Sequence, residues 1–347
     1  MPANNPKLLF LEKRLTDTLQ LAAEKAAAHL SNPSAYPLPP ANTRSMERAL
    51  YEVAMALPKR KRDDFAEKLM TSVQGSPASR LSRFGDLAAI DLKKAMPVHE
   101  QVKAIAIPEA MKLTSDENAL PDLKKFVPGA LKKSKQLQPA QAVLATKLDF
   151  IVDSVTCNKT NDLKKDEIRM GAFGNDSTGA SFNTDPFFVG KFKKNDSIPA
   201  GAKGNLFVFS ADGGSVGGFP ITYLAGLFLI EEDLIHNEEL GNKLSFAFAL
   251  AMPLLIAAAS GALFIPGTGP TISTILFVAA GVSAFLGHYL IPAMIDDFSA
   301  VVTDTLVLEQ QPLIGETISK TLEFTIPGSV AGYKKAKYTA AVRWVTS

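Results

Sequence analysis

The sequence predicts an α+β protein, in which an N-terminal helical module precedes an antiparallel β-sandwich with an inserted hydrophobic helical hairpin. Apolar side chains recur at helical spacing in residues 6–73. Beyond residue 147, short segments rich in β-branched and aromatic residues alternate with polar turns, as in antiparallel strands. A long stretch without a charged side chain, residues 245–295, interrupts these strand-like segments.

Residues 1–96 are predicted to form the helical module. We expect helices at Pro6–Leu30, Ser45–Leu57 and Pro58–Val73, and a possible fourth at Ser79–Met96. Four prolines in residues 32–42 make the first connection a linker that cannot continue a helix. Four successive cations, Lys59–Arg62, occupy the corner where the second and third helices join.

Residues 97–147 read as a basic connector, which prolines divide into short helical pieces. Residues 148–347 are predicted to be the β-sandwich. The run 223–232 is continuously apolar and fits a strand or a helix equally well. The segments that we expect to be strands are 148–157, 166–173, 204–210, 300–309, 320–326 and 338–345.

The uncharged stretch has the length of two membrane-spanning helices. Its arms, Ser245–Ile265 and Thr271–Ile295, are joined by a turn with two prolines and two glycines. A helix rises about 1.5 Å per residue, so roughly 20 residues cross a hydrocarbon core of about 30 Å. Small residues in both arms allow the close helix contact that membrane hairpins favour. The residues expected to insert are Phe248, Leu255, Ile256, Leu263, Ile275, Phe277, Val278, Phe285 and Leu286.

Acidic residues flank both arms, whereas a permanent membrane anchor more often has basic flanks. Carboxylates and histidines at the ends of a helix pair suit insertion after proton uptake. The predicted pH trigger comprises Glu231, Glu232, Asp233, His236, His288, Asp296 and Asp297.

The two arms and their short turn resemble the central hydrophobic hairpin of pore-forming colicins, whose pore domains are otherwise all helical. That resemblance implies membrane insertion. Two alternatives stay open on the residues alone: a helical pair buried within the fold, and a permanent two-span membrane protein. The first is compatible with insertion, because a protein can hide its hairpin in water and release it at a membrane.

Carboxylates near strand ends suggest a calcium site. Calcium takes six to eight oxygen ligands, often from loops. The run Leu148-x-Phe150-x-Val152, followed by Cys157 and by acidic residues around the next turn, is similar to a C2-like sandwich, which implies binding of calcium and phospholipid. The candidate ligands are Asp162, Asp166 and Glu167, and their alternative interpretation is solvated turn carboxylates.

The residues give little support to catalysis. The four histidines lack metal-ligand spacing, and neither an HExxH motif nor a Gly-x-Ser-x-Gly elbow is present. The single cysteine, Cys157, lies in an apolar strand and is expected to be a buried structural thiol. Trp344 is expected in the core or at a membrane interface. We therefore predict no enzyme and no cofactor except possible calcium.

The predicted function is membrane perturbation by a pore-forming toxin or effector. Its expected partners are a lipid bilayer, possible secretion or injection machinery such as a contractile apparatus, and further copies on the membrane, but not nucleic acid. No secretory signal is expected, because charges interrupt the apolar run Leu8–Leu11. We therefore expect synthesis in the cytoplasm and action at a target membrane after delivery. The main rival hypothesis is a non-catalytic adaptor with the hairpin buried against partners. A third hypothesis is an enzyme with an unrecognised site.

Overall fold

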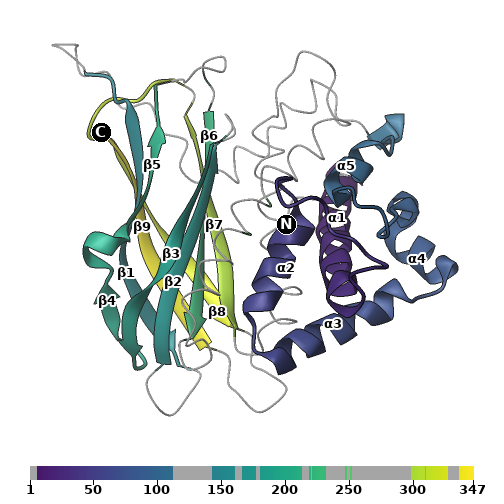
Figure 1. The fold of residues 1–347 in the computed structure, drawn as a ribbon. Coiled ribbons are helices and arrows are strands. Elements are labelled where there is room, and N and C mark those ends of the chain that lie inside the picture. The colour runs from purple at the N-terminus through teal and green to yellow at the C-terminus, as the bar shows by residue number, and fades with distance from the viewer. Residues whose placement is uncertain are drawn as a thin grey trace. The chain divides into compact units, whose positions relative to one another are not determined.

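A computed structural model gives the fold of this chain in two compact units, one helical and one built of β-strands (Figure 1). The helical unit is described for residues 6–111 and for residues 247 and 251. The β unit accounts for the remaining ranges in the list that follows. The structure describes residues 6–111, 143–160, 166–176, 180–212, 219, 221–231, 247, 251, 298–308, 310–326 and 336–347.

The helical unit is arranged around its first helix, α1 (Pro6–Ser31), which packs against α2, α3 and α5. Leucines and alanines on several sides of α1 are buried, so this helix has neighbours around most of its circumference. The remaining elements are α2 (Met46–Ala56), α3 (Lys59–Val73), α4 (Pro77–Phe84), the 3-10 helix η1 (Gly85–Ala89), α5 (Val98–Lys103) and the 3-10 turn η2 (Glu109–Met111). The helical unit therefore continues beyond Met96 into the predicted connector.

Local sequence signals explain where these helices begin and end. The Ser45 hydroxyl accepts a hydrogen bond from the Arg48 amide and caps α2. The Ser76 hydroxyl caps α4 in the same way through the Ser79 amide. At Gly85 the chain takes a φ of 55°, a left-handed conformation that glycine adopts readily. The first three predicted helices are confirmed. The possible fourth is α-helical only as far as Phe84, since α4 ends there and irregular chain follows η1.

The β unit consists of two antiparallel sheets. One sheet has the strand order β4-β1-β9-β8, with β5 also paired to β1, and the other has the order β3-β2-β6-β7. A 3-10 turn, η5 (Gly201–Gly204), precedes β5. The strands are β1 (Lys147–Lys159), β2 (Asp166–Asp176), β3 (Ser181–Phe192), β4 (Ser197–Pro199), β5 (Asn205–Ser210), β6 (Ile221–Glu231), β7 (Phe298–Leu308), β8 (Thr317–Ile326) and β9 (Ala336–Thr346).

Both sheets contribute to one core between them. Alternate residues of β1 and β9 meet alternate residues of β2 and β6, as the two-residue period of strands requires. The Phe150 and Trp344 rings lie 4.6 Å apart between centroids, and Phe209 lies 5.3 Å from Tyr223. Trp344 is therefore a core residue, one of the two roles expected for it.

The α+β class and the antiparallel pairing are confirmed, and residues 223–231 of the ambiguous apolar run prove to belong to a strand. Two strands, β3 and β4, were missed by the sequence interpretation. β3 contains Pro186 and is an edge strand, the position in a sheet where proline is tolerated. The predicted helical hairpin lies outside the described residues, apart from Ala247 and Ala251.

Two glycines leave room for aromatic rings on neighbouring strands of the second sheet. A Cβ atom on Gly226 would lie 2.1 Å from Phe173 Cζ, and one on Gly171 would lie 2.1 Å from Phe228 Cζ. Gly171 pairs with Phe228 and Gly226 pairs with Phe173 across β2 and β6, so the two contacts are reciprocal. These glycines are required by close packing and not by an unusual backbone conformation.

We predict that Gly226→Ala destabilises the protein by about 1–3 kcal/mol, because the Phe173 ring must leave its position. Urea unfolding followed by the fluorescence of Trp344, the only tryptophan, measures this loss. Thr321→Ala on the exposed side of β8 is the control and should change stability by less than about 0.5 kcal/mol. Equal unfolding midpoints for the two variants would contradict the packing argument.

Candidate functional site

The point at which the predicted hairpin leaves the β unit is defined by two paired strands. β6 and β7 are antiparallel neighbours, with Ile221 opposite Leu308 and Ile230 opposite Phe298. Opposed Cα atoms in such a pair lie about 5 Å apart. The chain therefore leaves the sheet after Glu231 and returns to it at Phe298 at nearly the same point, which we call the root.

Most residues predicted to insert or to sense pH lie outside the described residues. Ala247 and Ala251, within the first arm, are helical, and both are buried. Glu231 ends β6, where its backbone pairs with Ile168 of β2. The predicted residues outside the described ranges are Phe248, Leu255, Ile256, Leu263, Ile275, Phe277, Val278, Phe285, Leu286, Glu232, Asp233, His236, His288, Asp296 and Asp297. Within the described ranges, none of the helices has both the length and the apolar character needed to cross a bilayer.

A buried carboxylate ties β7, one strand of the root, to the opposite sheet. Asp304 Oδ2 accepts a hydrogen bond from Trp344 Nε1 at 2.7 Å. Its other oxygen accepts from Lys320 Nζ at 2.6 Å, and that ammonium also reaches the Thr305 carbonyl at 3.2 Å. Because Lys320 lies on β8 and Trp344 on β9, one side chain links three strands across the core.

A second carboxylate joins the sheets near their other end. The Tyr338 hydroxyl of β9 donates a hydrogen bond to Asp166 of β2, and both side chains are buried. Burial is the main cause that raises the pKa of Tyr338, and the neighbouring Asp166 adds to it. The Cys157 thiol lies in the same cluster, where burial raises its pKa to about 11. The prediction of a buried structural thiol is confirmed.

The structure places two of the three candidate calcium ligands on opposite faces of β2. Asp166 points into the core towards Tyr338, whereas Glu167 is partly exposed and forms an ion pair with Lys191 of β3. Successive strand residues alternate between faces, so these two carboxylates do not converge. Asp162 lies outside the described residues. Among the residues that the structure does describe, no group of three acidic, histidine or cysteine side chains could hold a metal ion.

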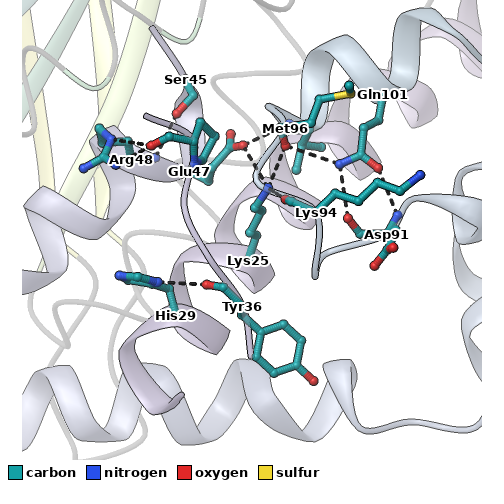
Figure 2. Close-up of polar contacts among 12 residues, drawn as sticks. Lys25, His29, Tyr36, Ser45, Glu47, Arg48, Asp91, Lys94, Met96 and Gln101 are labelled. Carbon is teal, nitrogen blue, oxygen red and sulfur yellow. Dashed lines mark hydrogen bonds and ion pairs between the residues drawn. The ribbon is translucent and has the colours of Figure 1, made fainter. Parts of the chain in front are cut away.

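The helical unit contains a buried lysine, Lys25 of α1, whose side chain is fully covered and whose polar contacts Figure 2 shows. Its ammonium donates to the carbonyls of Lys94 and Met96, at 2.7 and 2.6 Å, and lies 3.7 Å from Glu47 Oε1. Glu47 Oε1 also accepts from the Val98 amide at 2.9 Å. Burial lowers the pKa of Lys25 and raises that of Glu47.

Arg14 provides a similar contact at the other end of α5. Its guanidinium donates to the carbonyls of Val102 and Ile105, at 3.0 and 2.7 Å. The Glu47 carboxylate thus lies at the N-terminus of α5 and a cation at its C-terminus, which is the arrangement that the helix dipole favours. Burial lowers the pKa of His99 on α5, so the neutral imidazole is favoured in the folded protein.

A further buried carboxylate, Glu24, holds α3 and α4 to α1. It accepts a hydrogen bond from Ser72 at 2.6 Å and lies 3.5 Å from Arg80 and 3.7 Å from Arg83. Burial raises the pKa of Glu24 despite these cations. Each described charge in this network contacts backbone groups or other protein side chains, so the arrangement is that of a structural tether.

The sequence interpretation did not single out Arg14 or Lys25, which lie between the apolar positions of the first helix. It missed that both would be buried, together with Glu24 and Glu47. A usable signal is the small residues around Lys25, such as Ala22, Ala26 and Ala28, which allow other segments to approach α1 from several sides. Comparison with known proteins adds nothing to the geometry, because no family model, curated protein or solved structure matches the chain.

We predict that Lys25→Met destabilises the helical unit by about 3–5 kcal/mol, because it leaves the Glu47 carboxylate buried without its cation. The double variant Lys25→Met/Glu47→Leu should lose less than the sum of the single losses, since neither charge is stranded. Far-UV circular dichroism during urea unfolding measures the cycle. The exposed pair Lys59–Asp63 provides the control, and Lys59→Met should cost less than about 1 kcal/mol. If the stability losses of the two single variants added up to the loss of the double variant, the coupling between Lys25 and Glu47 would be refuted.

A second prediction concerns the Cys157 thiol, which should not react with a disulfide reagent in the native protein at pH 8. In the folded protein the thiol has a pKa of about 11, whereas an exposed thiol has a pKa near 9. The unfolded chain therefore binds fewer protons in this window, and the thiol's contribution to stability falls as pH rises from 9 to 11. Cys157→Ala should show a shallower loss of stability over this range. Identical pH profiles would exclude this contribution.

Proposed function

We propose that this chain is a membrane-inserting protein that acts as a pore-forming toxin or effector. The observation that carries the proposal is the root, where β6 and β7 pair on either side of the long uncharged segment. A segment whose ends lie at one point can leave the fold without disturbing the register of the strands that hold it. The finer architecture included in the proposal is a β-sandwich with a hydrophobic helical hairpin, residues 245–295, inserted between these strands.

The geometry of the root restricts how such a segment could cross a bilayer. Because both ends remain on the side of the β unit, the chain must cross an even number of times. Two arms, Ser245–Ile265 and Thr271–Ile295, satisfy this condition, and each has the length that a crossing helix needs. Apolar side chains on both arms supply the favourable transfer into hydrocarbon.

Acidification is the proposed trigger. The acidic residues beside the root, Glu231 and Glu232 on one side and Asp296 and Asp297 on the other, carry negative charge at neutral pH. Their protonation would lower the cost of approaching an anionic membrane, and protonation of His236 would add positive charge. Delivery to the target membrane by an injection apparatus and assembly of several copies there belong to the same proposal.

A non-catalytic adaptor is the second candidate, and the two described residues of the first arm are compatible with it. Ala247 and Ala251, four residues apart on one helical face, are both buried. A hairpin that is permanently covered would have this property, and so would a hairpin that is covered only before insertion. The two candidates therefore differ in what happens when lipid is supplied.

We predict that the purified protein releases dye from liposomes, and more strongly at pH 5 than at pH 7.5. Leu255→Asp and Ala279→Asp should each abolish release, because a carboxylate near the centre of an arm costs about 2.5–3.5 kcal/mol to insert. Thr321→Asp, which adds the same charge to the exposed side of β8, should behave as wild type. An adaptor would release no dye at either pH, and equal release by all variants would show that the hairpin is not responsible.

A further inference from the structure

The corner between α2 and α3 combines four cations with an exposed apolar side chain. Lys59, Arg60, Lys61 and Arg62 form the first turn of α3, which follows α2 directly (Figure 1). Met55, near the end of α2, is 41% exposed, and its sulfur lies 3.6 Å from Arg62 Nη1. We call Met55 and Lys59–Arg62 the basic corner.

The stability of α3 does not account for this arrangement. The helix dipole favours carboxylates in a first turn and cations in a last turn, but α3 has no acidic residue in its first turn and no basic residue in its last. Pro58 precedes the helix and provides no side-chain cap. The Lys59–Asp63 pair is exposed, at 2.8 Å, and has the cation N-terminal to the carboxylate, which is the weaker order for a helix.

The cations and the carboxylates of α3 are also separated along the helix. Asp63 and Asp64 follow in the second turn, where Asp63 pairs with Lys59, so the four cations of the corner outnumber these two carboxylates. Lys59 and Arg60 are exposed, and Met55 lies beside the cationic turn instead of in the core. Local rules that are broken at an exposed position commonly mark a binding surface.

We propose that the basic corner binds anionic lipid headgroups and holds the chain at a bilayer before the hairpin enters; this inference rests on the proposed function. Each Lys or Arg near an anionic membrane surface strengthens binding by about fivefold. An exposed methionine can enter the interfacial region that such cations approach. Single-stranded nucleic acid fits the corner less well, because Met55 and Lys59–Arg62 include no aromatic side chain on which bases could stack.

Vesicle sedimentation tests the proposal with full-length protein and two lipid compositions. Wild type should bind vesicles of phosphatidylcholine with one third phosphatidylglycerol and should bind pure phosphatidylcholine much more weakly. Lys59→Gln/Arg60→Gln should weaken binding to the anionic vesicles about 25-fold, and added salt should reduce the difference. Lys193→Gln/Lys194→Gln removes the same charge from exposed positions of the β unit and should bind as wild type.

Circular dichroism identifies a folding defect, and none is expected, since removing cations from the first turn should not destabilise α3. Equal losses in the two charge variants would overturn the proposal by showing a general charge effect. Binding of a duplex oligonucleotide in preference to anionic vesicles would also overturn it. Leu255→Asp separates docking from insertion, because it should still sediment with anionic vesicles while dye release is lost. Failure of dye release alone therefore concerns the hairpin, and failure of sedimentation alone concerns the corner.

Discussion

Ile230 of β6 and Phe298 of β7 lie opposite each other, so a long and largely apolar segment begins and ends at one point of an intact sheet. That pairing is supported from across the core. Asp304 of β7 holds Trp344 and Lys320, which belong to two strands of the opposite sheet. The strand β7, on one side of the insertion, is therefore tied to two strands of the opposite sheet as well as paired with β6.

Buried charges in the helical unit have a different role: they provide hydrogen-bond partners for backbone groups in irregular segments. Residues 90–105 contain only the short helix α5, so much of their backbone lacks partners in regular structure. Lys25 satisfies the carbonyls of Lys94 and Met96, and Arg14 satisfies those of Val102 and Ile105. Buried backbone groups must find partners, and charged side chains provide stronger hydrogen bonds than neutral ones. The energetic cost of burying these charges is therefore offset by the backbone that they hold in place.

Regular elements with strong periodic patterns were predictable from the sequence, and features that depend on distant partners were not. The leucine spacing of α1 and the alternation in β9 depend only on which residues of that element are buried, so both patterns can be read from the local sequence. β3 was missed because Pro186 and exposed polar residues hide an edge strand that only its pairing with β2 defines. Lys25 and Glu47 look like surface residues in sequence, since their burial depends on a segment about 50–70 residues away. Asp166 and Glu167 suggested one site, but strand alternation directs them to opposite faces.

The same topology bears on the acidic residues that flank the apolar arms. An insertion that starts and finishes on one side of a bilayer never carries its flanks through the hydrocarbon, so the charge on Glu231 or Asp297 need not be transferred across. In the proposed function, their negative charge would act instead at the surface, where it would repel anionic headgroups over about a Debye length of 8 Å. The cationic patch Lys59–Arg62 would act over the same range with the opposite sign. In the proposed function, different parts of the chain would then govern approach to the membrane and entry into it. Approach would be sensitive to salt and pH, and entry to the apolar length of the arms.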